Sequence, residues 1–281
     1  MKKLILLFIG ILVVGLFVNA KVKSEFPEKI DFAGEETPLH IPDVKERMDR
    51  ELVVNKFMHG STILILKRAN RVFPVIEPIL AKYNVPDDFK YLAVIESSLT
   101  NAVSSAGARG VWQFMPLTAK EKGLEVSETV DERYHLEKST EAACKYLISA
   151  KERFGSWTMA AASYNGGMNG LQTQIDFQGV NNYYDLLLNE ETSRYVFRIL
   201  ALKEIMKNPV KYNFVISQDQ LYQKVPTKKI QVDSTVSNLA IFSKLQGINY
   251  KTLKYYNPWL RDKKLDNPNK KVYEIEIPEV K

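Results

Sequence analysis

The chain has 281 residues and 45% of them are hydrophobic, which favours a folded globular protein and argues against a disordered one. Its formal net charge is +6, and residues 211–281 carry this whole excess, with 13 Lys and Arg against 7 Asp and Glu. The single cysteine, Cys144, excludes a disulfide within the chain. We therefore expect a fold stabilised by packing, with Cys144 as a buried apolar thiol.

The first twenty residues have the pattern of a secretory signal peptide, predicted over residues 1–20. Two lysines precede an uncharged, almost wholly apolar run at residues 4–18, and the sequence VNA at 18–20 fits a cleavage site. A membrane span needs roughly 20 residues, so an uncleaved anchor is the less favoured alternative. No cysteine lies near the predicted cleavage site, so nothing there indicates lipid attachment. Export argues against a nucleic-acid partner for the basic C-terminal part.

Residues 21–42 are charged, contain three prolines and show little periodicity, so we predict an N-terminal arm or linker there. From 43 to 210 the apolar spacing is helical and predicts one helical domain. Pro74 and Pro78 are expected to be breaks or first-turn residues. The predicted helical segments are 43–58, 61–83, 85–98, 139–155, 156–167 and 190–209.

The pattern changes after residue 210, where short alternating segments replace the long helical ones. Two short helices are predicted at 234–247 and 249–260. Strands are predicted at 212–216, 228–232 and 271–280. We therefore expect a second, small β-α-α-β domain over residues 211–281.

One acidic residue stands out in the helical part. Glu96 follows the apolar run at 91–95, and Ser97 and Ser98 are expected to end that helix. A carboxyl group among apolar neighbours resists ionisation, so its pKa should rise, as a general acid requires. A structural glutamate near a helix end is the alternative. Cleavage of a glycosidic bond also usually takes two carboxylates.

The segment that follows Glu96 is suited to close approach by an elongated ligand. It is rich in small residues from Ser104 to Gly110, and the glycines tolerate unusual backbone dihedrals. Trp112 would supply an apolar face, and Gln113 a hydrogen-bond donor and acceptor, which is the mixture that sugar rings require. Trp112 could equally belong to the core.

Two later stretches carry further polar candidates. Tyr164 and Asn165 lie at a predicted helix end just before a glycine pair, and Glu191 and Tyr195 lie four residues apart on one face of the last long helix. Each pair alone is more often structural. Together with Glu96 they predict a polar cleft in a helical domain.

Four motifs in order resemble the lysozyme-like catalytic domain of membrane-bound lytic murein transglycosylases of the D type. They are Glu96-Ser97, GVWQFMP at 110–116, SYNGG at 163–167 and ETSRYV at 191–196. The resemblance covers residues 43–210 and implies a mainly α fold. It implies that Glu96 is the single catalytic acid/base. The implied substrate-binding residues are Ser104, Gln113, Tyr164, Asn165, Glu191 and Tyr195.

The resemblance also implies the reaction. The bond between N-acetylmuramic acid and N-acetylglucosamine in peptidoglycan would be cleaved without water, giving 1,6-anhydro ends, and no cofactor or metal is expected. A hydrolytic lysozyme of the same fold, with Asp131 or Glu191 holding a water, is one alternative. A non-catalytic wall-binding protein is another.

The C-terminal part resembles a diverged LysM peptidoglycan-binding module, with an auxiliary packing domain as the alternative. Residues 232–260 and 271–278 follow the module's order of helix, turn, helix and closing strand. Glycan strands of peptidoglycan are thus the expected partner, with no nucleic acid. We expect a monomer exported to the periplasm, and membrane association is left open.

Overall fold

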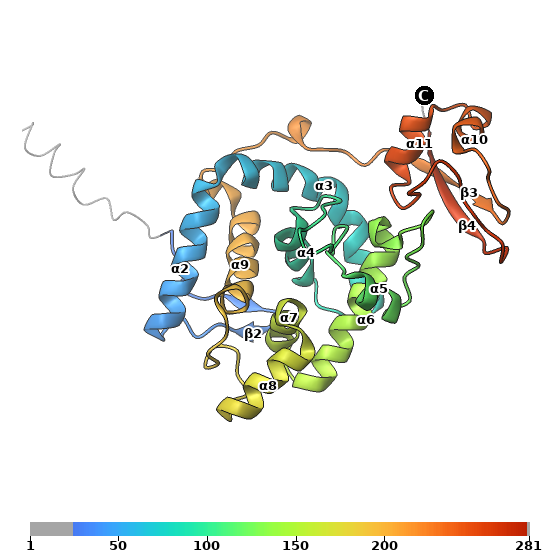
Figure 1. Cartoon of the computed structure of the whole chain (residues 1–281). Coiled ribbons are helices and arrows are strands. Elements are labelled where there is room, and N and C mark those ends of the chain that lie inside the picture. The colour runs from blue at the N-terminus through green and yellow to red at the C-terminus, as the bar shows by residue number, and fades with distance from the viewer. Residues whose placement is uncertain (1–24, 280–281) are drawn as a thin grey trace, which may run out of the picture.

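The structure, a computed structural model, describes residues 25–279. It consists of a helical domain with a small C-terminal unit to one side (Figure 1). The expected mainly α fold is confirmed. The helices of the first domain are α2 (Pro42–Phe57), α3 (His59–Lys82), α4 (Phe89–Ser97), α5 (Pro116–Glu121), α6 (Leu136–Phe154), α7 (Trp157–Gly166), α8 (Met168–Gln178) and α9 (Glu190–Lys207).

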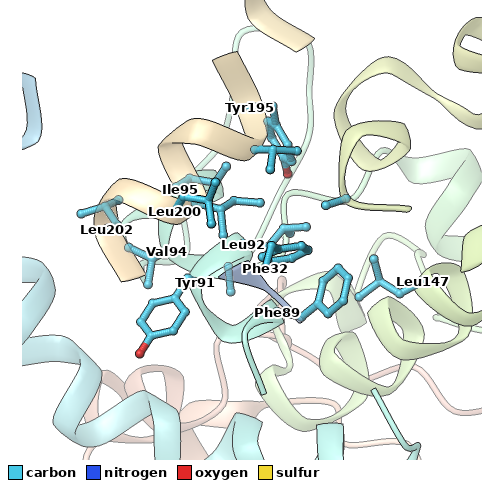
Figure 2. Packing of buried hydrophobic residues seen from close by; sticks show 14 of the residues in the cluster. Phe32, Phe89, Tyr91, Leu92, Val94, Ile95, Leu147, Tyr195, Leu200 and Leu202 are labelled. Carbon is cyan, nitrogen blue, oxygen red and sulfur yellow. The ribbon is translucent and has the colours of Figure 1, made fainter. Parts of the chain in front are cut away.

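Helix α9 lies at the centre of the helical domain, where it packs against α2, α4 and α7. It is buried over most of its length, and α4 exposes almost none of its side chains. Figure 2 shows apolar side chains of α4 and α9 gathered in this core. The burial of α4 explains its continuous apolar sequence, which lacks the one-sided pattern of a surface helix.

Helix α3 runs through both of its prolines, so the predicted breaks at Pro74 and Pro78 are wrong. A proline inside a helix removes one backbone hydrogen bond and costs about 3 kcal/mol. Here the helix buries a long apolar stripe, and that burial outweighs the local cost. The buried residues of this stripe include Ile65, Ala69, Val72, Ile76 and Leu80.

The described part of the predicted arm at 21–42 is not a linker. Strands β1 (Asp31–Phe32) and β2 (Glu35–Glu36) pair as an antiparallel hairpin. Phe32 is fully buried and meets Phe89 edge to face, with 5.0 Å between ring centroids (Figure 2). Ile30 is buried in the same core and Phe26 packs against it, so these few apolar residues anchor a segment whose prolines and charges predicted an arm or linker.

A buried ion pair joins the hairpin to two helices. The Lys203 ammonium on α9 donates to Asp88 Oδ2 at 2.6 Å and to the Asp31 carbonyl at 2.6 Å. Asp88, just before α4, also accepts from the Ala33 amide at 2.7 Å. Both charged groups of the pair are buried, but each has several partners, which is the condition for tolerating buried charge.

The C-terminal unit has the predicted β-α-α-β order. It contains β3 (Thr227–Val232), α10 (Leu239–Leu245), α11 (Tyr250–Tyr256) and β4 (Tyr273–Pro278). The two strands pair antiparallel, with Val232 opposite Tyr273. The alternation of buried Ile275 and Ile277 with charged residues explains why β4 was recognisable.

The strand predicted at 212–216 is absent, and that prediction is wrong. Residues 209–212 instead form the short 3-10 helix η2 (Pro209–Tyr212), and Tyr212 and Phe214 are buried against the helical domain. Apolar residues in a short run can anchor a linker as readily as they build a strand.

The two parts of the chain share one interface. Val130 and Tyr134, from the short segment before α6, belong to the core of the C-terminal unit. Val130 also forms an antiparallel bridge with Leu260. The small domain is therefore packed onto the helical one and is not merely tethered to it.

The signal peptide predicted over residues 1–20 lies outside the described residues. Within the described part of the chain, no helix has the length and apolar content needed to cross a membrane. Cys144 is buried, as predicted, and burial raises the pKa of its thiol to about 12.

Candidate active site

Glu96 is in the last turn of α4, and the chain turns sharply after it. Ser98 has the left-handed conformation, with φ of 52°, and its amide donates to the Val94 carbonyl. The Ser97 hydroxyl donates to the Val111 carbonyl at 2.8 Å, which joins the helix end to the following loop. The predicted helix end at Ser97 and Ser98 is thus confirmed, and it fixes the backbone that carries Glu96.

The carboxyl group of Glu96 is largely buried and is bonded to one tyrosine. Burial raises the pKa of Glu96 to about 7, and the negative charge of Glu191 acts in the same direction. The Tyr195 hydroxyl donates to Glu96 Oε1, which opposes this rise, as does the positive charge of Arg198. The carboxyl group can therefore hold a proton near neutral pH, as a general acid must.

The loop after α4 lies beside this acid and is tightly bonded within itself. Gln113 has a left-handed φ of 49°, and its side-chain amide donates to the carbonyls of Ala102 and Gly110 at 3.0 and 2.7 Å. Both amide hydrogens are thus used by the loop. The side-chain oxygen of Gln113 is what this residue can offer to a ligand.

The Tyr164 and Asn165 pair comes from the end of α7. The Tyr164 hydroxyl donates to the Trp112 carbonyl at 2.8 Å. Asn165 donates to Glu191 Oε1 at 3.0 Å and accepts from the Thr192 hydroxyl at 2.8 Å. The third and fourth motifs are thereby joined by direct hydrogen bonds.

The bonded residues Asn165 and Glu191 each line a different cavity. One, of about 490 Å³, is lined by Glu191, Ser98 and Arg198 among others. The second, of about 550 Å³, is lined by Gln113, Tyr164 and Asn165 among others. Glu96 itself lines neither cavity, but Ile95 and Ser98 line the first, and the charge of Glu96 acts on Tyr164, which lines the second. A ligand that spans both cavities would therefore pass close to the acid.

Neither Trp112 nor Ser104 lines the two cavities. Trp112 is fully buried, and its indole N–H donates to the Thr140 hydroxyl at 2.8 Å, so it is a core residue and not a sugar-facing surface. Ser104 bonds within its own turn, where its hydroxyl accepts from the Ala108 amide at 3.0 Å.

The sequence reasoning missed Arg198, whose guanidinium donates to the Ile95 carbonyl at 3.3 Å and whose charge lowers the pKa of Glu96. The signal was available, because Arg198 follows Tyr195 by three residues and therefore lies on the same helix face. Among residues 25–279, no group of three or more His, Cys, Asp or Glu side chains is arranged to hold a metal ion.

Comparison with known proteins adds two family matches. Residues 74–186 match the model "Transglycosylase SLT domain", and residues 228–281 match "Soluble lytic transglycosylase C-terminal LysM-like domain". The first match includes Glu96, Gln113 and Tyr164. It ends before Glu191 and Tyr195, so the hydrogen bonds of these two residues to Asn165 and Glu96 connect them to the matched domain.

The curated relatives agree with the family matches. The chain is 28% identical over 235 residues to "Membrane-bound lytic murein transglycosylase D" of Escherichia coli strain K12 and of Escherichia coli O6:H1, which covers 80% of this chain and 50% of each relative. It is 31% identical over 120 residues to a "Putative tributyltin chloride resistance protein" of Alteromonas sp. strain M-1, covering 40% of this chain and 58% of that protein. The chain spans about half the length of the first two relatives. The chain therefore contains an SLT transglycosylase domain followed by a LysM-like domain of the kind found at the C-terminus of soluble lytic transglycosylases.

Proposed function

We propose that this protein is a peptidoglycan lytic transglycosylase. It cleaves the β-1,4 bond between N-acetylmuramic acid and N-acetylglucosamine and leaves a 1,6-anhydro ring on the muramic acid. The observation that carries the proposal is Glu96, a half-buried carboxyl group with its pKa raised to about 7 and a tyrosine hydroxyl bonded to it. The SLT domain match supports the same reaction.

In the first step, protonated Glu96 gives its proton to the glycosidic oxygen as the bond to C1 of the muramic acid breaks. The leaving sugar departs with that proton as its new hydroxyl. The positive charge that develops at C1 is the charge that a nearby carboxylate or an N-acetyl oxygen would stabilise. Tyr195 keeps the carboxyl group oriented and, by donating to it, favours its ionised form as the proton leaves.

In the second step, ionised Glu96 takes the proton from the C6 hydroxyl of the same muramic acid, and the C6 oxygen forms a bond to C1. The acid is thereby returned to its starting form, and no water is consumed. Because the nucleophile is already part of the substrate, little orienting entropy is lost. One carboxyl group is then sufficient, which removes the objection that glycosidic cleavage usually needs two.

The proposal is tested by the Glu96→Gln variant. We expect a loss of wall cleavage of about 10³-fold, since general acid catalysis typically contributes 10²–10⁴-fold. Purified cell-wall sacculi are digested, and the released fragments are measured by mass spectrometry. Wild-type fragments should be one water lighter than hydrolysed ends. The exposed residue Glu36 supplies the control, Glu36→Gln, which should keep full activity.

The hydrolytic alternative needs a second group to hold a water, and one of its two candidates is already engaged. Asp131 is buried and forms a two-point ion pair with Arg133, with contacts of 2.9 and 2.8 Å. Glu191 is exposed and bonded to Asn165. If the digest contained only hydrated ends, the lytic proposal would be wrong and Glu191 would become the candidate base.

The non-catalytic alternative, a wall-binding scaffold, predicts that Glu96→Gln behaves as wild type. Pull-down with insoluble sacculi separates the two ideas in the same variant. We expect binding to be retained while cleavage is lost.

We propose further that residues 43–210 are the catalytic domain and 211–281 a peptidoglycan-binding module. The family matches at 74–186 and 228–281 and two distinct hydrophobic cores support this division. The net charge of +6 on the second part suits an anionic wall polymer. Sacculus binding should therefore weaken as salt is raised from about 0.05 to 0.5 M, because the Debye length shortens.

We also propose that the protein is exported to the periplasm. The basic start and apolar run at residues 4–18 support export, and a relative is named as membrane-bound. Cell fractionation with N-terminal sequencing of the mature protein tests this. A new N-terminus at Lys21 is expected, and an intact Met1 in the membrane fraction would instead indicate an anchor.

A further inference from the structure

The segment 129–131 joins the C-terminal unit through its backbone. The Asp131 amide donates to the Trp259 carbonyl at 2.9 Å, and the Arg261 amide donates to the Thr129 carbonyl at 2.8 Å. These bonds flank the bridge between Val130 and Leu260. The segment is therefore paired antiparallel with residues 259–261 of the C-terminal unit.

Arg133, two residues further on, reaches in the opposite direction. Its guanidinium is held at two points by Asp131 and also donates to the carbonyls of Gly107 and Phe114, each at 3.1 Å. Arg133 and Asp131 are both buried. A guanidinium with several partners in one plane fixes their relative positions more strictly than a lysine could.

The two carbonyls that accept from Arg133 belong to the loop that carries Gln113. Arg109 and Phe114 exchange backbone hydrogen bonds at 3.1 and 3.2 Å, and Gln113 lies inside that pair. The loop also passes very close to the Arg133 backbone, since a Cβ atom added to Gly110 would lie 1.8 Å from the Arg133 carbonyl oxygen. The position of this loop thus depends directly on the segment 129–133.

We propose that Arg133 is a positioning residue for the cleft loop 102–114 and that the C-terminal unit holds Arg133 in place through the segment 129–131. The C-terminal unit then acts in catalysis as well as in wall binding. Its docking sets the position of Gln113 and of the loop wall beside Glu96. The catalytic part of this inference rests on the proposed function.

The first test replaces Arg133 with lysine in the full-length protein. Arg133→Lys keeps the charge but cannot hold Asp131 at two points and both carbonyls together. We expect faster amide hydrogen exchange in peptides covering 102–114, with α9 peptides unchanged, and a fall in kcat of about tenfold with a smaller change in KM. The control Arg50→Lys changes an arginine that pairs with Glu190 at the surface, and it should leave loop exchange unaltered.

The second test loosens the interface from the C-terminal side. Arg261→Pro removes the amide that donates to Thr129. The matched variant Arg261→Ala keeps this amide and removes only the guanidinium, which lies 4.2 Å from the Tyr134 ring. We expect loop exchange to increase much more in the proline variant than in the alanine variant. If the proline unfolds the C-terminal unit, as β4 exchange would reveal, the loop should respond at least as strongly.

Two substrates separate positioning from wall binding. A short soluble glycan made of alternating N-acetylglucosamine and N-acetylmuramic acid needs no wall binding, whereas insoluble sacculi do. Positioning predicts that Arg261→Pro lowers kcat on both substrates. A loss confined to sacculi, or unchanged exchange at 102–114 in Arg133→Lys and Arg261→Pro, would overturn the inference. Hydrogen exchange does not depend on activity, so a failure of the proposed reaction would be seen separately.

Discussion

Two opposing influences act on Glu96, burial and the hydroxyl group of Tyr195. Burial penalises the charged carboxylate, while the hydrogen bond from Tyr195 favours it. The balance leaves a carboxyl group that can both give and take a proton near neutral pH. A fully exposed glutamate would already be ionised, and one without the tyrosine would give up its proton less readily in the proposed first step.

The tyrosine's share of this balance can be measured in Tyr195→Phe. Removing the hydroxyl should raise the pKa of Glu96 further, because the bond that favours ionisation is lost. A hydrogen bond to a charged group is worth about 1.5–3 kcal/mol, so the alkaline limb of the kcat profile should move up by on the order of one pH unit. The wild-type limb is expected near pH 7. If the alkaline limb of the kcat profile stayed at the same pH or moved to lower pH, the hydrogen bond from Tyr195 would not favour the carboxylate.

The buried acid should also cost stability. Because the pKa of Glu96 is raised to about 7 in the folded protein from an ordinary 4.5, the folded state holds the proton more tightly than the unfolded chain. The free energy of unfolding is therefore highest, as far as Glu96 is concerned, below about pH 4.5, and it falls as the pH rises through 7. Glu96→Gln should therefore be more stable than wild type by up to about 3 kcal/mol at pH 8 and nearly equal at pH 4.5. Urea denaturation at both pH values checks this, and an equal gain at each would contradict the cause given.

At the scale of elements, the β1–β2 hairpin secures the start of α7. Glu35 accepts from the amides of Trp157 and Thr158 at 2.7 and 2.8 Å and from the hydroxyls of Ser156 and Thr158. A carboxylate at a helix N-terminus satisfies amides that have no partner within the helix. α7 carries Tyr164 and Asn165 at its other end, so the hairpin helps to hold the cleft.

Glu35→Gln should destabilise the protein by about 1–2 kcal/mol at pH 7, as the loss of a good helix cap does. These bonds lower the pKa of Glu35 to about 2, so the stabilisation is present above about pH 4.5 and disappears as the pH falls through 2. Thermal melts of wild type and variant should therefore converge in acid. The neighbouring Glu36→Gln, at an exposed position, should melt as wild type does at every pH.

Two glycines in the cleft loop give a matched pair. Both have positive φ, of 89° at Gly107 and 83° at Gly110, but only Gly110 faces a neighbouring backbone. Gly107→Ala should cost about 1–2 kcal/mol from the left-handed conformation alone. Gly110→Ala should cost more than about 3 kcal/mol, since the Arg133 backbone must also move. If the two substitutions lowered the free energy of unfolding equally, the Arg133 backbone would be able to move away from residue 110 without cost.

At the scale of the whole molecule, the two domains are joined by shared core residues. Val130 and Tyr134 follow the cleft loop in sequence but are buried with Leu260 and Ile275 of the C-terminal unit. Charge pairs surround this contact, including Lys271 with Glu125 at 2.7 Å and Lys229 with Glu137 at 2.9 Å. The buried apolar contact is less sensitive to salt than the pairs around it.

The shared core predicts coupled unfolding. Calorimetry of the full-length protein should give a single transition, because unfolding of the C-terminal unit exposes Val130 and Tyr134. Val130→Ala should lower that transition as one unit, at a cost of about 1–3 kcal/mol. Two separate transitions, with only one affected by the substitution, would mean that the domains are energetically independent.

The sequence by itself determined the mainly helical class and the β-α-α-β tail, and it marked Glu96 as a candidate acid. These follow from local patterns: helical spacing, alternation in the last strand and an apolar run ending in an acid. The hairpin at 31–36 and the backbone at 212–216 could not be predicted correctly, and the sequence left open whether Trp112 belongs to the core, because burial depends on residues distant in sequence. Only the tertiary structure decided that Tyr195 bonds Glu96 and that Arg133 links the C-terminal unit to the cleft loop. Each contact joins segments that are far apart in sequence, and the apolar spacing within one segment says nothing about the other. Only packing brings their side chains within hydrogen-bonding distance.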